Sequence, residues 1–169
     1  PPGEASRSPA IAPFLPLSRS TESLIVLGGV SERAAPDKAY NSALVLHRGE
    51  IVARYHKVHR FDADLETGSL RESGVVERGT RPVLVDWNGV RIGLSICYDL
   101  RFPEFYRALA SHGAHVLLVP SAFTVPTGKA HWHTLLRARA IENQAFVLAP
   151  ALVGVHRPGR ESFGHTLAI

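Results

Sequence analysis

The region 90–120 constrains the fold more than any other part of this chain. An apolar run at 90–96 is typical of a buried strand, and Pro103 and Gly113 suit the start and the end of a helix after it. A second apolar run, 115–120, again predicts a strand. A strand, a helix and another strand in this order favour a layered α/β arrangement.

The flanking segments extend the same pattern. Two strand-like runs, 42–47 and 51–56, enclose a turn at Arg48-Gly49-Glu50 and predict a hairpin. Asn88-Gly89 between two strand-like runs predicts a second hairpin. The remaining expected elements are strands at 24–29, 145–152 and 163–169 and a helix at 131–144.

The first 23 residues have a different character. They are rich in Pro and Ser and show no apolar periodicity, so we expect 1–23 to be a disordered lead segment. The ordered domain is expected to occupy 24–169, a length that fits one domain.

Charge, hydropathy and cysteine content argue against several classes of protein. The net charge of +4 comes from 19 basic and 15 acidic residues without a basic stripe, so no nucleic-acid partner is expected. No run approaches the roughly 18 apolar residues of a membrane span, so no membrane partner is expected either. A single cysteine allows no internal disulfide and no signal-peptide pattern is visible, so we expect a cytoplasmic protein.

That single cysteine, Cys97, is the first candidate for chemistry. It ends a buried strand and faces the start of a helix, where positive partial charge favours a thiolate. The alternative is a small buried hydrophobe, which is the usual role of a lone cysteine. A cysteine–histidine pair of the kind that papain-like proteases use also remains open.

Lys57 is the second candidate. In an extended strand Ile51, Ala53 and Tyr55 share one mostly apolar face with Lys57, which aims the ammonium at the interior. There it could stabilise negative charge that develops on a substrate oxygen. The alternative is a lysine whose ammonium reaches back to water.

Neither the acidic residues nor the histidines give a sharper signal. Glu72 lies in a glycine-spaced loop, where Glu66 and Glu77 are equally plausible on local grounds. His131 and His133 are two apart, so on a helix they point in different directions. With one cysteine and no ligand spacing, no metal site is expected.

Three stretches together resemble a known family. They are 55–62 (YHKVHRFD), 93–104 (GLSICYDLRFPE), and 120–123 (PSAF) followed by 128–133 (GKAHWH) and 137–144 (RARAIENQ). In this order they resemble the nitrilase, or carbon–nitrogen hydrolase, superfamily, and most of all its Nit branch of small amidases. The resemblance covers 24–169.

The resemblance implies an α-β-β-α sandwich that commonly pairs into dimers, so a homo-oligomer is expected. It implies hydrolysis of an amide or nitrile carbon–nitrogen bond without a cofactor, on a small-molecule substrate such as an ω-amide. Cys97 would form a thioester with loss of ammonia, and Lys57 with the Tyr98 backbone N–H would stabilise the oxyanion. Glu72 would position the lysine and the substrate. The residues expected to line the substrate pocket are Ser121, Phe123 and His131.

The sequence departs from the family pattern at both ends. The general-base glutamate belongs to a motif upstream of the strand at 24–29, and neither Glu4 nor Glu22 has the expected apolar-Pro-Glu setting. We therefore expect a member truncated at both ends, with an incomplete sandwich. Two functions stay open: an amidase, or a catalytically incomplete scaffold that acts by association. Within the active branch, N-carbamoyl compounds and nitriles are the alternative substrates.

Overall fold

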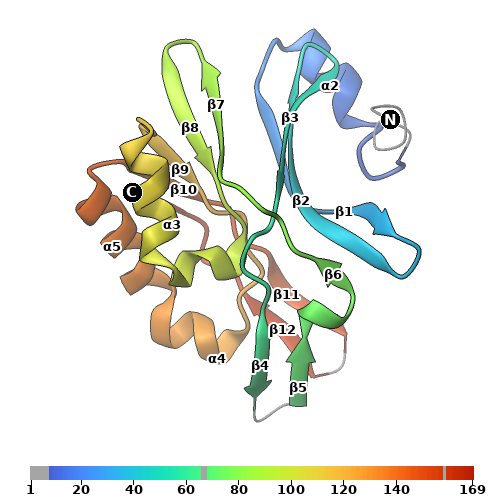
Figure 1. Cartoon of the computed structure of the whole chain (residues 1–169), viewed down its shortest axis with the longest axis vertical. Helices are drawn as coiled ribbons and strands as arrows, with labels where there is room; N and C mark the ends of the chain where they lie inside the picture. The colour runs from blue at the N-terminus through green and yellow to red at the C-terminus, as the bar shows by residue number, and fades with distance from the viewer. Residues whose placement is uncertain (1–7, 66–67, 158) are drawn as a thin grey trace.

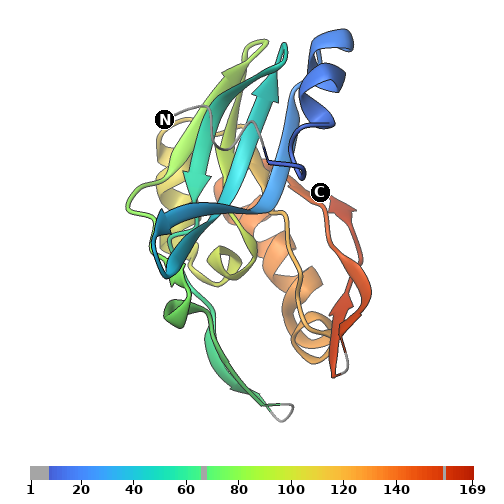
Figure 2. The same cartoon turned by 90° about the vertical axis from the view of Figure 1, so that its right-hand side faces the viewer.

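Two β-sheets pack face to face between helices (Figures 1 and 2). The computed structural model describes residues 8–65, 68–157 and 159–169. The layered α/β prediction is confirmed, and the order of layers is helix, sheet, sheet, helix.

The first sheet is antiparallel, in the order β1-β2-β3. Its strands are β1 (Ile25–Ala35), β2 (Lys38–His47) and β3 (Glu50–His56), and β6 (Val76–Glu77) pairs with β2 in parallel. The hairpin between β2 and β3 is confirmed, with Arg48 and Gly49 in the left-handed region at φ of 50° and 84°.

The second sheet has the order β13-β10-β9-β8-β7. Its strands are β7 (Val83–Trp87), β8 (Val90–Leu94), β9 (Val116–Leu118), β10 (Phe146–Ala149) and β13 (Leu167–Ala168). The predicted Asn88-Gly89 turn joins β7 to β8, and β8, β9 and β10 run parallel. Parallel neighbours need a crossover, which the helices supply.

Helices α3 (Pro103–Ser111) and α5 (His133–Asn143) cover the outer face of this sheet (Figure 1). Helix α3 buries Phe105, Tyr106 and Leu109. A short α4 (Val125–Thr127) and a wide turn η3 (Gly128–Trp132) lead into α5. The helix predicted over 131–144 therefore begins inside that turn.

The outer layer on the first sheet is helix α2 (Phe14–Ser20). Leu44 and Leu46 of β2 point away from the second sheet, and Ile11 packs on them with no exposed surface. The expectation of a disordered lead is thus wrong over 8–23, because the sheet needs an apolar cover that these residues provide. Residues 1–7 lie outside the described residues.

The main core lies between the sheets. Ala43 and Val45, which alternate with the outward leucines of β2, face Ile92 and Leu94 of β8. Tyr55 near the end of β3 joins the same cluster. The C-terminal ends of β3 and β8 both lie at this core. The residues that follow these two strands are therefore brought together.

Two small hairpins complete the chain (Figure 2). They are β4 (Asp62–Leu65) with β5 (Gly68–Arg71), and β11 (Val153–Arg157) with β12 (Arg160–Phe163). Short 3-10 turns, η1 (Glu72–Gly74) and η2 (Cys97–Arg101), carry two of the candidate residues. Among the described residues no helix is long and apolar enough to cross a membrane.

Candidate active site

Cys97 lies just after β8, where the chain makes a sharp turn. Its φ of 50° is in the left-handed region, which is uncommon for a residue with a side chain. Its backbone N–H donates to the Pro120 carbonyl at 3.0 Å, which ties the turn to the chain that leaves β9. A backbone held in such a conformation by its surroundings is a feature that often accompanies a functional residue.

Opposing effects act on the Cys97 thiol. Burial is the largest and raises its pKa above the ordinary value, whereas the Lys57 ammonium and the Ala122 backbone N–H lower it. The net shift is upward. The expectation of a favoured thiolate is therefore wrong for the resting protein: a 3-10 turn follows Cys97, the longer helix α3 begins only at Pro103, and desolvation exceeds the stabilising charges.

Lys57 is buried, with 3% of its surface exposed. Its Nζ donates to Glu72 Oε2 at 2.6 Å. The same carboxylate oxygen accepts the Phe61 backbone N–H at 2.6 Å, and Oε1 accepts Asn41 Nδ2 at 3.0 Å. The alternative of a lysine that reaches water is wrong, because its ammonium has a charged partner inside the protein.

The three predicted catalytic side chains are thus brought together. Lys57 and Glu72 contact each other, and both act electrostatically on the Cys97 thiol. Glu77, by contrast, pairs with Lys38 at 3.7 Å, and Glu66 lies outside the described residues. Local sequence did not distinguish Glu72 from Glu77, whereas in the structure Glu72 is the one of these two that contacts Lys57.

Asp99 joins the two segments that carry these residues. Its carboxylate is fully buried and accepts the Tyr55 hydroxyl at 2.7 Å, the Ile96 N–H at 2.8 Å and the His59 N–H at 3.0 Å. Burial and the nearby carboxylate raise the pKa of Tyr55, so its hydroxyl stays a donor. The chain after β3 is thereby fixed against the Cys97 turn.

An aromatic and cationic wall borders this turn. The Arg101 guanidinium lies 5.8 Å from the centre of the Tyr98 ring and 5.5 Å from that of Phe123. His131 Nδ1 lies 3.3 Å from Arg101. Phe123 is buried against Trp132, with ring centres 5.0 Å apart. Tyr98 and two of the predicted pocket residues, Phe123 and His131, therefore gather around one cation, Arg101, that sequence reasoning did not assign to the site.

Comparison with known proteins identifies the family. The family model described as carbon–nitrogen hydrolase matches residues 1–169. The chain belongs to the carbon–nitrogen hydrolase family.

Several of its curated relatives carry amidase names. The chain is 46% identical over 140 residues to a deaminated glutathione amidase of Yersinia enterocolitica, covering 81% of this chain and 49% of the relative. It is 51% identical over 136 residues to one of Synechocystis, covering 78% of this chain and 50% of the relative. The chain spans about half the length of the curated relatives it matches.

Solved structures of similar proteins share the fold. The Caenorhabditis elegans NitFhit protein matches with a TM-score of 0.89 at 40% identity, covering 98% of this chain and 41% of that one. Saccharomyces cerevisiae Nit3, a member of branch 10 of the nitrilase superfamily, matches with a TM-score of 0.77 at 30% identity, covering 92% and 55%. The carbon–nitrogen hydrolase type of sandwich is therefore confirmed.

Hydrogen bonds of the backbone and the hydroxyl hold Ser121 in this carbon–nitrogen hydrolase chain. Its N–H donates to Pro150 and its carbonyl accepts the Leu152 N–H, while its hydroxyl donates to the Val119 carbonyl at 3.0 Å. The neighbouring Ala122 N–H is the group that acts on the Cys97 sulfur. Sequence reasoning missed Ala122, since a backbone donor leaves no signal in residue type.

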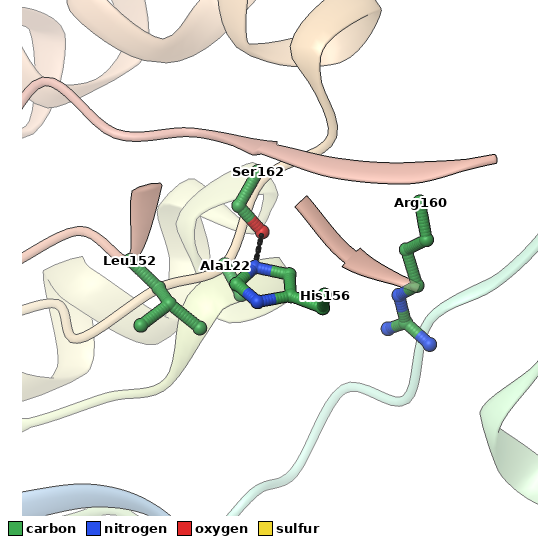
Figure 3. A pocket seen from close by; sticks show the side chains of 5 residues that line it. All are labelled: Ala122, Leu152, His156, Arg160 and Ser162. Atoms are coloured by element: carbon green, nitrogen blue, oxygen red, sulfur yellow. Dashed lines mark hydrogen bonds between the residues drawn. The ribbon is translucent and has the colours of Figure 1, made fainter. Parts of the chain in front are cut away.

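A cavity of about 290 Å³ opens beside this segment of the carbon–nitrogen hydrolase chain (Figure 3). The residues that line it are Ala122, Leu152, His156, Arg160 and Ser162. It lies on the β11–β12 hairpin.

Histidine chemistry is not supported in the described part of this carbon–nitrogen hydrolase chain. No histidine there is hydrogen-bonded to the Cys97 sulfur, so a papain-like pair has no geometric basis. His59 Nδ1 bonds to Asp99 at 2.8 Å instead. The described residues contain no cluster of three or more His, Cys, Asp or Glu side chains that could hold a metal ion.

Proposed function

We propose that this chain carries the nucleophile, the oxyanion donors and the lysine-positioning carboxylate of an amidase. The observation that carries the proposal is the buried Lys57 ammonium, held by Glu72 at 2.6 Å and acting on the Cys97 thiol. A buried ammonium is costly to maintain unless it is paired. Because the ammonium acts on the single thiol of the chain, its burial is explained by a catalytic role.

The proposed reaction begins with attack of Cys97 Sγ on the amide carbon. Negative charge then moves to the carbonyl oxygen, where Lys57 Nζ and the Tyr98 backbone N–H would stabilise it. One such donor typically contributes about 3–4 kcal/mol to the transition state. Collapse of the tetrahedral intermediate breaks the carbon–nitrogen bond and leaves a thioester on Cys97.

Water completes the cycle. It attacks the thioester carbon, the carbon–sulfur bond breaks, and a carboxylic acid leaves as the thiol is restored. A proton must move from the thiol to the departing nitrogen in the first half, because the pKa of Cys97 is raised and the thiol starts protonated. The family resemblance assigns that transfer to an upstream glutamate.

Two substrate types follow from different observations. The resemblance favours a small ω-amide, from which ammonia is lost. The names of the curated relatives favour deaminated glutathione, whose amide nitrogen would leave as an amine instead. Amidase names among relatives and solved neighbours support an amide over a nitrile or an N-carbamoyl compound.

A catalytically incomplete scaffold is the second candidate. Its support is that both carboxylates acting on the Cys97 thiol, Glu72 and Asp99, are already occupied by hydrogen bonds. Exposed apolar side chains at Ile141 and Phe146, 76% and 70% exposed, support association with another copy. On this basis we also propose a homo-oligomer.

We further propose a cytoplasmic location, because free cysteines such as Cys97 are kept reduced there.

Turnover and the acylated protein would be measured together. The full chain is incubated with an ω-amide or with deaminated glutathione, ammonia or amine is quantified, and intact mass reports the thioester. We expect turnover with the thioester mass in the natural chain, and neither in Cys97→Ala. In Lys57→Gln we expect turnover to fall about 100-fold or more, with Lys129→Gln as the surface control. Full turnover in Cys97→Ala, or none in any form, would reject the amidase.

A further inference from the structure

The cavity on the β11–β12 hairpin has a cation without a partner. Arg160 is exposed, and among the described residues its guanidinium forms no hydrogen bond or ion pair. Figure 3 shows its side chain extending along the open side of the cavity, away from the strand that carries it. Within the described part of the chain, no acidic side chain lines the cavity. Glu161 alternates with Arg160 along β12, which puts its side chain on the other face.

A polar pair, formed by a buried serine and an exposed histidine, lines the same cavity. Ser162 is 5% exposed, and its Oγ is 2.8 Å from His156 Nε2 (Figure 3). Gly154 pairs with Ser162 across the hairpin, and a Cβ built on it would meet nothing within 4 Å. The glycine therefore leaves the space beside the pair open.

The hairpin is fixed to the segment that follows Ala122. The Phe163 N–H donates to the Phe123 carbonyl at 2.8 Å, and Thr124 bridges to Ser162. Ala122 lines the cavity and its N–H acts on the Cys97 sulfur. Through Ala122, the cavity therefore adjoins the proposed reaction centre.

We propose that this cavity binds a carboxylate of the substrate, with Arg160 as the specificity-determining residue and the Ser162–His156 pair beside it. The inference rests on the proposed amidase function for the identity of the ligand. Arginine suits the role because its planar guanidinium donates two parallel hydrogen bonds to a carboxylate. The cavity would hold the end of the substrate remote from the scissile amide.

Binding without turnover tests this assignment. All proteins carry Cys97→Ala, and calorimetry measures the affinity of matched acidic and neutral probes. Glutaramate against glutaramide places the carboxylate on the acyl side, and N-acetylglycine against N-acetylglycinamide places it on the amine side. The variants are Arg160→Gln, the surface control Arg33→Gln, and Arg101→Gln as the competing cation.

We expect at least one acidic probe to bind about tenfold or more tightly than its neutral partner, in keeping with a charge-assisted bond. That preference should vanish in Arg160→Gln, return in part in Arg160→Lys, and persist in Arg33→Gln. Unfolding midpoints of the variants show whether each is folded.

Three results would overturn the assignment: no binding or no acidic preference in the parent protein, a preference that survives Arg160→Gln, or one that depends on Arg101 alone. Failure of the amidase itself is recognised separately, since it appears as absent turnover in the chain with Cys97 intact. A carboxylate preference with no turnover would leave the cavity assignment standing.

Discussion

At the Cys97 sulfur, burial and charge act in opposite directions, and the balance decides how the residue can be used. Desolvation raises the pKa of the thiol more than Lys57 and the Ala122 N–H lower it. A thiol that is protonated at rest reacts only when a substrate or a base removes the proton. In the proposed mechanism, Lys57 would therefore serve the developing oxyanion as much as the Cys97 thiol.

The pH dependence of alkylation reports this balance. Because the thiolate is the reactive form, the rate of Cys97 alkylation by iodoacetamide should rise with pH, with a midpoint above the ordinary thiol pKa of about 8.5. Lys57→Gln removes the stabilising ammonium, so its midpoint should move to still higher pH. Lys129→Gln, which changes an exposed lysine, should leave the midpoint unchanged. A midpoint below the ordinary value, or one indifferent to Lys57, would contradict the assignment.

At the scale of elements, the site depends on how loops are tied together after their strands end. Asp99 holds Tyr55, Ile96 and His59 at one carboxylate, and Glu72 gathers Lys57 and the Phe61 N–H at another. Local sequence places Lys57 on the inner face of a strand, but partners from other segments are what hold its ammonium inside. Glu72 lies 15 positions from Lys57, and Asp99 lies 44 positions from Tyr55, so periodicity cannot reveal these pairs.

Gly79 offers a test of this tethering. Its N–H donates to the Lys57 carbonyl at 2.9 Å, and an added Cβ would overlap the His56 carbonyl oxygen. Gly79→Ala should therefore displace the chain that carries Lys57, lower the free energy of unfolding by about 1–3 kcal/mol, and reduce turnover about tenfold or more.

Gly74→Ala is the matched control, since its added Cβ meets nothing within 4 Å and its backbone is not left-handed. Urea unfolding and initial rates would be compared for the two variants. If both variants had the same stability and the same rate, the close approach of Gly79 to the backbone of His56 and Lys57 would not be needed for stability or turnover.

At the scale of the whole molecule, the sequence predicts the layers that carry strong local patterns. Both hairpin turns, α3 and the strand–helix–strand order at 90–120 follow from turn residues, caps and apolar runs. What it could not predict depends on surfaces made by distant segments. The lead resembles a loop until the outward leucines of β2 are known to need cover. The cavity at the β11–β12 hairpin likewise depends on distant segments, because the Phe163 N–H pairs the hairpin with Phe123 in the segment after β9.

The α2 layer gives the prediction that belongs to this scale. Ile11 has no exposed surface and packs on Leu44 and Leu46, so Ile11→Ala should lower the free energy of unfolding by about 2–4 kcal/mol. Leu17→Ala in helix α2, which follows Ile11, is the control, because Leu17 is 47% exposed and its truncation should cost far less. Chemical denaturation followed by tryptophan fluorescence would measure both. A chain whose stability ignores Ile11 would have a lead detached from the sandwich, and the first sheet would then present its leucines to solvent or to another copy.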